Sequence, residues 1–161
     1  MYEIGDFIVH PGQGVCQVEG MEEGPTPVYH LMPVHGRNPM LIKYPVASEA
    51  NLRPVISAEE AQSLIEGFST MEPDSFTDRS AVLEEKHFKS VIRHGSCVDV
   101  MRIAKTFTQR IAKVEAAHKK APVIYERILK EAKERSMEEL TCALDEDADQ
   151  VTARFQAALS H

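Results

Sequence analysis

The residues of this 161-residue chain that could do chemistry include seven histidines, three cysteines and, among its adjacent glutamates, the pairs Glu84-Glu85 and Glu138-Glu139. His87 and His94 are seven residues apart, so on a helix they share a face but stand nearly two turns from each other. Glu84-Glu85 and Glu138-Glu139 fall on expected helices, where adjacent side chains diverge, and both pairs are expected to be solvated. The chain has no P-loop, no G-x-S-x-G turn and no H-E-x-x-H motif. We therefore expect no enzyme activity, no cofactor and no metal site.

The cysteines also give no indication of a metal site. Cys16, Cys97 and Cys142 are widely separated, with no C-x-x-C pattern and no histidine at metal-ligand spacing beside them. An odd number of scattered cysteines favours neither a disulfide framework nor a zinc site. We predict buried thiols.

The charge is unevenly distributed. The net charge is −7, which by itself argues against a nucleic-acid partner, because Lys and Arg supply most of the affinity for phosphate. Residues 86–135, however, hold thirteen Lys or Arg against five Asp or Glu, between two acidic regions. No apolar run is long enough to span a membrane, and the first residues lack the pattern of a signal peptide, so we expect no membrane partner and a cytoplasmic location.

The elements that must position these residues change in character along the chain. Short alternating runs over residues 4–10, 14–21, 28–34 and 39–45 predict strands, and so few strands cover a core only by curling into a small barrel of the SH3-like or Tudor-like kind. The Pro11–Gly14 loop predicts a hairpin turn, since no Lys or helix follows it to bind a phosphate.

From residue 57 the apolar spacing is helical. Ser57 with Glu60 predicts a capping box, Gly95 a helix end and Ser96 the cap of a long helix, which Ala121-Pro122 interrupts. The predicted fold class is α+β, with a small β-barrel domain at residues 1–53 and an all-α domain at residues 57–161.

Residues 5–15, with the sequence Gly-Asp-Phe-Ile-Val-His-Pro-Gly-Gln-Gly-Val, resemble the opening of the CarD family, where a Gly-Asp, two apolar residues and Pro-x-x-Gly-Val begin a Tudor-like domain. Further short matches follow in the family's order. They are Tyr29–Leu31, Met40–Pro45, Asn51–Arg53, Phe88–Ser96, Glu126–Lys133 and Glu138–Leu140. The resemblance covers about residues 1–145, and its specificity comes from the order of the pieces.

This resemblance implies an accessory bacterial transcription regulator whose barrel binds the β-subunit lobe of RNA polymerase, as the equivalent module of the transcription-repair coupling factor does. The expected contact is one exposed strand, whose backbone is available to pair with a polymerase strand while its lysine meets an acidic partner. Its residues are Met40, Leu41, Ile42, Lys43, Tyr44 and Pro45.

In the family, the helical domain lies at the upstream edge of the melted promoter, where a Trp wedges against the minor groove and nearby cations hold phosphates. This chain has no Trp, and Phe76 takes its place, with Arg79 as the nearest cation and Asp78 in the expected basic region. Phe can act as an apolar wedge, although it lacks the indole N–H. The alternative is that Phe76 packs between the two domains.

Lys86, Lys89 and Arg93 are the remaining candidates for DNA contact, because their spacing places them on one helix face. Such a run forms either a solvated face or a phosphate-binding track. A phosphate track would bind promoter DNA weakly and without sequence specificity, and would modulate open-complex stability. The alternative function is a protein–protein adaptor that binds RNA polymerase without touching DNA. The oligomeric state is left open.

Overall fold

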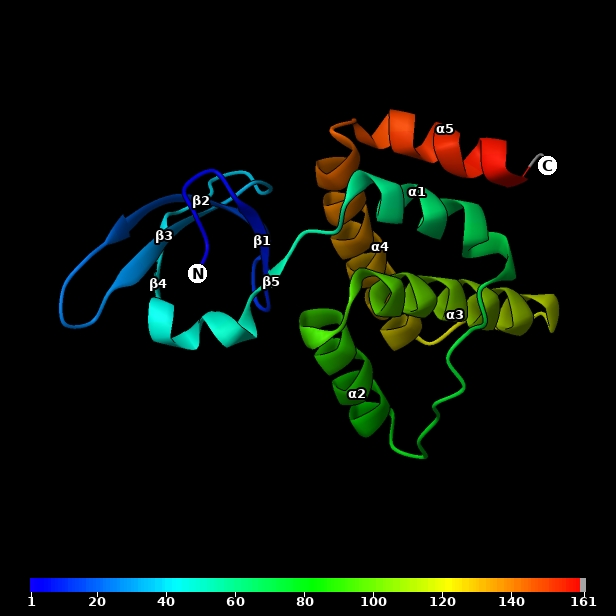
Figure 1. The fold of residues 1–161 in the computed structure, drawn as a ribbon. Coiled ribbons are helices and arrows are strands. Elements are labelled where there is room, and N and C mark those ends of the chain that lie inside the picture. Colours follow the sequence, from blue (N-terminus) through cyan, green and yellow to red (C-terminus); the bar gives the residue numbers. More distant parts are fainter. Residues whose placement is uncertain (160–161) are drawn as a thin grey trace.

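A computed structural model describes residues 1–159, which form an antiparallel sheet followed by five α-helices (Figure 1). The strands are β1 (Phe7–His10), β2 (Gly14–Glu22), β3 (Val28–Pro33), β4 (Ile42–Pro45) and β5 (Arg53–Pro54). The α-helices are α1 (Ala58–Gly67), α2 (Ala81–His94), α3 (Cys97–Ala116), α4 (Val123–Leu144) and α5 (Ala148–Leu159). The predicted α+β class is confirmed.

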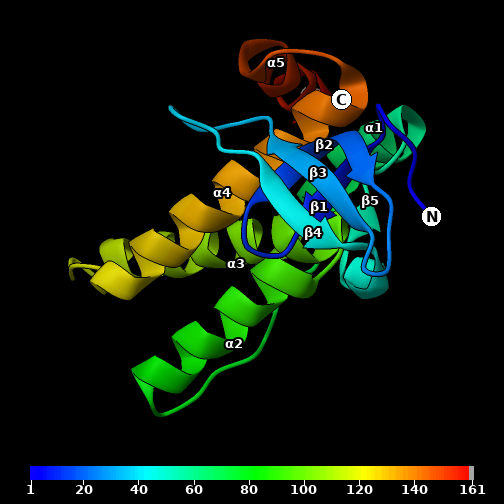
Figure 2. The same ribbon diagram turned by 90° about the vertical axis from the view of Figure 1, so that its left-hand side faces the viewer.

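The five strands form one sheet in the order β4-β3-β2-β1-β5. Neighbouring strands pair antiparallel, and a 3₁₀ helix at Val46–Asn51 carries the chain from one edge of the sheet to the other. No pairing joins β4 to β5, so the sheet curls without closing, and the predicted barrel is a loose one. Figure 1 shows β4 on the side of the sheet away from the helices, and Figure 2 shows the curled sheet in front of them.

The core of the sheet comes from the alternation of apolar residues. Ile8, Cys16, Val18, Tyr29, Leu31 and Leu52 are at most 5% exposed and pack together on one face. Two strands begin later than the sequence predicts. Ile4 is 70% exposed and lies in a turn closed by the Asp6 N–H and the Glu3 carbonyl, so β1 begins at Phe7. Residues 39–41 precede β4, which begins at Ile42.

The helices begin and end at the predicted signals. The Ser57 hydroxyl accepts from the Glu60 N–H at the start of α1, and Ser96 forms a reciprocal capping box with Asp99 at the start of α3. Gly95 follows the last residue of α2, and the position requires glycine, because a Cβ there would lie 2.6 Å from the Val91 carbonyl oxygen. Pro122 precedes α4, whose first helical residue is Val123.

Helix α4 organises the helical part of the molecule. It contacts α1, α2, α3, α5 and also β2, and Figure 1 shows it between the sheet and the other helices. One core of α2, α3 and α4 residues surrounds Phe88, Phe107 and Ile128, and a second core of α1, α3, α4 and α5 residues surrounds Ile65, Leu140 and Val151. None of the helices described in residues 1–159 is long and apolar enough to cross a membrane.

Candidate functional site

Strand β4 is an edge strand, and its outer side is free along residues 42–45. The Val46 N–H donates to the Pro27 carbonyl oxygen at 3.0 Å, which sets the alternation of the antiparallel ladder. Ile42 and Tyr44 therefore use their backbone groups toward β3, and the N–H and C=O of Lys43 point to the free edge. Pro45 has no N–H, so the free edge offers a short run of backbone groups.

The side chains of this segment separate into two sets. Ile42 and Tyr44 are half-buried against the core of the sheet, where the Tyr44 hydroxyl donates to the Ser48 carbonyl at 3.1 Å. Met40 and Leu41 are 78% and 43% exposed. The segment thus presents two large apolar side chains beside an unpaired strand edge, which is a combination typical of protein-binding surfaces.

Lys43 belongs to a small charged group on the outer face of the sheet. Its Nζ lies 3.3 Å from the Glu22 carboxylate, and His30 Nε2 lies 3.2 Å from the same oxygen. The Lys43 ammonium group and then the His30 imidazole, both close to this carboxylate, lower the pKa of Glu22. Because the Lys43 side chain is 63% exposed, this ion pair is weak and leaves the ammonium group accessible to a partner.

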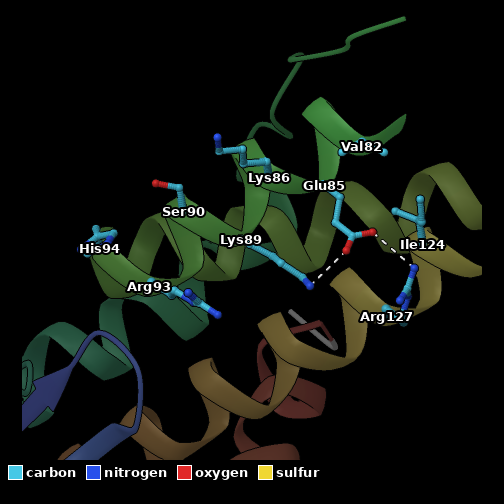
Figure 3. A pocket seen from close by; sticks show the side chains of 9 residues that line it. All are labelled: Val82, Glu85, Lys86, Lys89, Ser90, Arg93, His94, Ile124 and Arg127. Carbon is cyan, nitrogen blue, oxygen red and sulfur yellow. Dashed lines mark hydrogen bonds and ion pairs between the residues drawn. The ribbon is translucent and has the colours of Figure 1, made fainter. Parts of the chain in front are cut away.

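A second surface lies between α2 and α4, where four Lys or Arg side chains are among the nine residues that line a hollow of about 580 Å³ (Figure 3). Its lining residues are Val82, Glu85, Lys86, Lys89, Ser90, Arg93, His94, Ile124 and Arg127. Glu85 is the single carboxylate among them, and it pairs with Lys89 at 3.0 Å and Arg127 at 3.4 Å. Within residues 1–159, Lys86 and Arg93 make no ion pair, so their charges stay uncompensated.

The structure brings together three of the five predicted DNA contacts. Lys86, Lys89 and Arg93 share one face of α2, as their spacing predicts. Phe76 does not line this hollow. Its ring stacks on His87 with centroids 3.7 Å apart and meets Phe88 edge-on at 5.8 Å, so it is half-buried on another side of α2. Arg79 is exposed and likewise lies outside the hollow. The packing of Phe76 is within the helical part and not between the two domains.

Other cations of the basic region hold the segment between α1 and α2. Arg102 donates to the Glu72 carbonyl, and Lys105 donates to the carbonyls of Phe68 and Ser69. Arg110, a residue that the sequence did not single out, donates to the Phe76 carbonyl at 2.6 Å and forms an ion pair with Glu84 at 3.0 Å. These side chains hold the backbone of the segment between α1 and α2, so they are not free to bind phosphates.

The prediction that both glutamate pairs are solvated is wrong. Glu84 is 8% exposed and is held by Arg110, while Glu139 is 3% exposed and forms a bidentate ion pair with Arg53. Glu138 lies against the turn between β1 and β2, and burial raises its pKa. Adjacent residues do diverge on a helix, but one member of each pair then points into the protein.

The cysteines are free thiols. Cys16 and Cys97 are buried, as predicted, and Cys142 is half-buried. Burial raises the pKa of Cys16 and of Cys142 to about 11, and it also raises that of Cys97. All three thiols are therefore protonated and poor nucleophiles at neutral pH. Among residues 1–159, no group of three or more His, Cys, Asp or Glu side chains is placed to hold a metal ion.

Comparison with known families finds a match for the residues that form the sheet. A family model described as the CarD-like/TRCF RID domain matches residues 2–56, a stretch that contains all five strands and the free edge at β4. A search of curated proteins finds no match to the chain. The resemblance seen in the sequence is confirmed for this part, and it indicates a transcription-related protein that interacts with RNA polymerase. Residues 2–56 of this chain are similar to the CarD-like/TRCF RID domain.

Proposed function

We propose that this chain is an accessory bacterial transcription regulator, without enzyme activity, that binds the β-subunit lobe of RNA polymerase and modulates promoter open-complex stability. The observation that carries the proposal is the free edge of β4 within a CarD-like/TRCF RID domain. A polymerase strand would extend the sheet by pairing with the outward backbone groups of Lys43, and the exposed Met40 and Leu41 would cover apolar surface beside it.

The α2–α4 hollow is the proposed DNA-proximal surface. Its Lys and Arg side chains would contact phosphates of upstream promoter DNA without reading its sequence. Contacts that form only with melted DNA would shift the equilibrium between closed and open complexes toward the open one. The polymerase, held by the sheet, would supply the choice of promoter.

A second candidate function is an adaptor that binds polymerase and a further protein without contacting DNA. The packing of Phe76 favours this function, because a ring stacked on His87 and packed edge-on against Phe88 is not free to wedge into a minor groove. Asp78 is exposed in the same segment, where its carboxylate would repel phosphate. The two functions share the polymerase contact and differ in whether DNA is bound.

The polymerase contact is tested by measuring binding of the full chain to RNA polymerase and to its isolated β-lobe. We expect Lys43→Glu to weaken binding by about tenfold or more, because it reverses the charge offered to an acidic partner and adds a carboxylate beside Glu22. Lys133→Glu, at an exposed position on α4, makes the same charge change elsewhere and should bind like the wild type. Absence of binding by the wild type would reject the proposal.

Pairing through the backbone has its own test. Lys43→Ala and Lys43→Pro both remove the ammonium group, but only the proline also removes the N–H that points to the free edge. Since that N–H makes no bond within the sheet, an edge strand tolerates the proline. We expect Lys43→Pro to bind polymerase clearly more weakly than Lys43→Ala, and equal affinities would show that the edge is not extended.

A further inference from the structure

The Arg53–Glu139 ion pair joins the sheet to the helical part at a buried point. Arg53, on β5, donates from Nη1 and Nη2 to the two oxygens of Glu139 on α4, each at 2.7 Å. Glu139 also accepts from the Ile56 N–H at 3.1 Å, and Arg53 Nε donates to the Gly95 carbonyl at 3.1 Å. One carboxylate that is 3% exposed thus ties β5, the linker and, through Arg53, the turn between α2 and α3.

A second group of contacts holds the turn between β1 and β2. Arg135, one turn before Glu139 on α4, donates to the carbonyls of Pro11 and Gly12 at 3.2 and 2.9 Å. The Glu138 carboxylate accepts from the Val15 N–H at 3.4 Å. Glu138 and Glu139 lie three and four residues after Arg135, so the three side chains come from one turn of α4 and reach different parts of the sheet.

Apolar packing fills the space between these two groups. Val9 and Val15 lie on the face of the sheet opposite its own core, and both are buried at 8% and 1% exposure. They meet Ile92 of α2 and Val100 of α3 around a cavity of about 10 Å³, which is at the lower limit for one water molecule. The contact is therefore closely packed, unlike a hinge between independent domains.

We infer that Arg53, Glu139 and Arg135 are positioning residues that lock the sheet and the helical part into one rigid unit. This inference rests on the proposed function, because its purpose is to hold the polymerase-binding edge at β4 and the α2–α4 hollow at a fixed separation and angle. A regulator tethered by one surface then presents the other at one place on the promoter, and no ordering is needed at the moment of contact.

The test compares Glu139→Gln with Glu146→Gln in the full chain. The control carboxylate also binds an arginine through both oxygens, Arg154 at 2.6 and 2.9 Å, but this ion pair joins the turn before α5 to the middle of α5. Backbone residual dipolar couplings report the orientation of each part. In the wild type and in Glu146→Gln we expect one alignment tensor to fit both parts, and in Glu139→Gln we expect two.

Function is measured on the same variants. Glu139→Gln should bind polymerase within about twofold of the wild type, since β4 is untouched, yet lose the change in open-complex half-life that the wild type produces. A single tensor in folded Glu139→Gln would overturn the lock. Two tensors with an unchanged effect on open complexes would overturn its positioning role. Failure of the wild type to bind polymerase would overturn the proposed function alone, because the couplings test the lock independently.

A milder variant covers the case in which Glu139→Gln does not fold. Arg53→Lys keeps the positive charge beside Glu139 but loses the two-pronged geometry and the Nε bond to Gly95. We expect it to give two tensors as well, with the effect on open complexes reduced. A single tensor in Arg53→Lys together with normal function would overturn the inference.

Discussion

His10 lies at the end of β1, where the sheet meets α4. Its Nδ1 accepts the N–H groups of Gly12 and Gln13 at 3.0 and 3.1 Å, so the turn requires an imidazole that is unprotonated at that nitrogen. Burial and then the nearby Arg135 lower the pKa of His10. Its ring also meets Tyr44 of β4 edge-on at 5.3 Å, which connects the turn to the candidate polymerase-binding strand.

These contacts predict a pH dependence of stability. Because the pKa of His10 is lower in the folded state than its ordinary value of 6.5, its contribution to stability is present above pH 6.5 and is lost as the pH falls through the folded-state value. His10→Asn should remove this dependence, since the amide oxygen can accept the same N–H groups and does not titrate. The measurement is the free energy of unfolding in urea at a series of pH values, and equal slopes for both chains would contradict it.

At the scale of elements, the turn between β1 and β2 is shaped to fit α4. Gly14 has a φ of +79°, which residues other than glycine rarely adopt, and a Cβ there would lie 2.6 Å from the Glu138 carboxylate. The glycine is thus required both by the turn and by the close approach of the helix. The conformation of the turn and its docking are coupled through one position.

Gly14→Ala is therefore expected to lower the free energy of unfolding by about 2 kcal/mol, as the sum of backbone strain and the clash with Glu138. The clash can be separated from the strain by a double-mutant cycle with Glu138→Ala. In that background the alanine at position 14 should cost less, because only the strain remains. Additive effects in urea unfolding would show that the turn does not press against α4.

At the scale of the whole molecule, the candidate polymerase-binding edge at β4 and the cation-lined hollow between α2 and α4 are two separate surfaces. We expect binding to upstream fork-junction DNA to weaken steeply with salt, and the triple change of Lys86, Lys89 and Arg93 to alanine to reduce the slope of log K against log salt by about two to three. A matched control changes three lysines outside the hollow to alanine, giving the same net charge. Its positions are Lys113, Lys119 and Lys120.

Gel-shift titrations over a range of salt concentrations give both slopes. A control that loses as much affinity as the triple variant would show that the attraction is general and not located in the hollow. No shift by the wild type at low salt would favour the adaptor function over DNA contact. Neither result bears on the polymerase contact at β4, which the Lys43 variants test separately.

The sequence by itself determined the elements and the fold class. Serine caps, Gly95, Pro122 and the change from alternating to helical spacing are local signals, and each acts within a few residues of the structure it sets. The resemblance of residues 5–15 to the CarD family is local in the same way, since their glycines and proline shape one short segment. One local prediction is wrong. The apolar alternation places Ile4 in a strand, but Gly5, with φ +98°, turns the chain there.

Only the tertiary structure decided which charged residues are structural and which are exposed. Arg53 and Glu139 are 86 residues apart, and neither has a neighbour in sequence that marks it as buried. The consecutive apolar pairs Ile8-Val9 and Val15-Cys16 did carry a signal, because alternate residues of a strand face opposite sides and both sides were therefore covered. What covers the second side is set by long-range packing of α4, and the spacing of residues along the chain does not contain it.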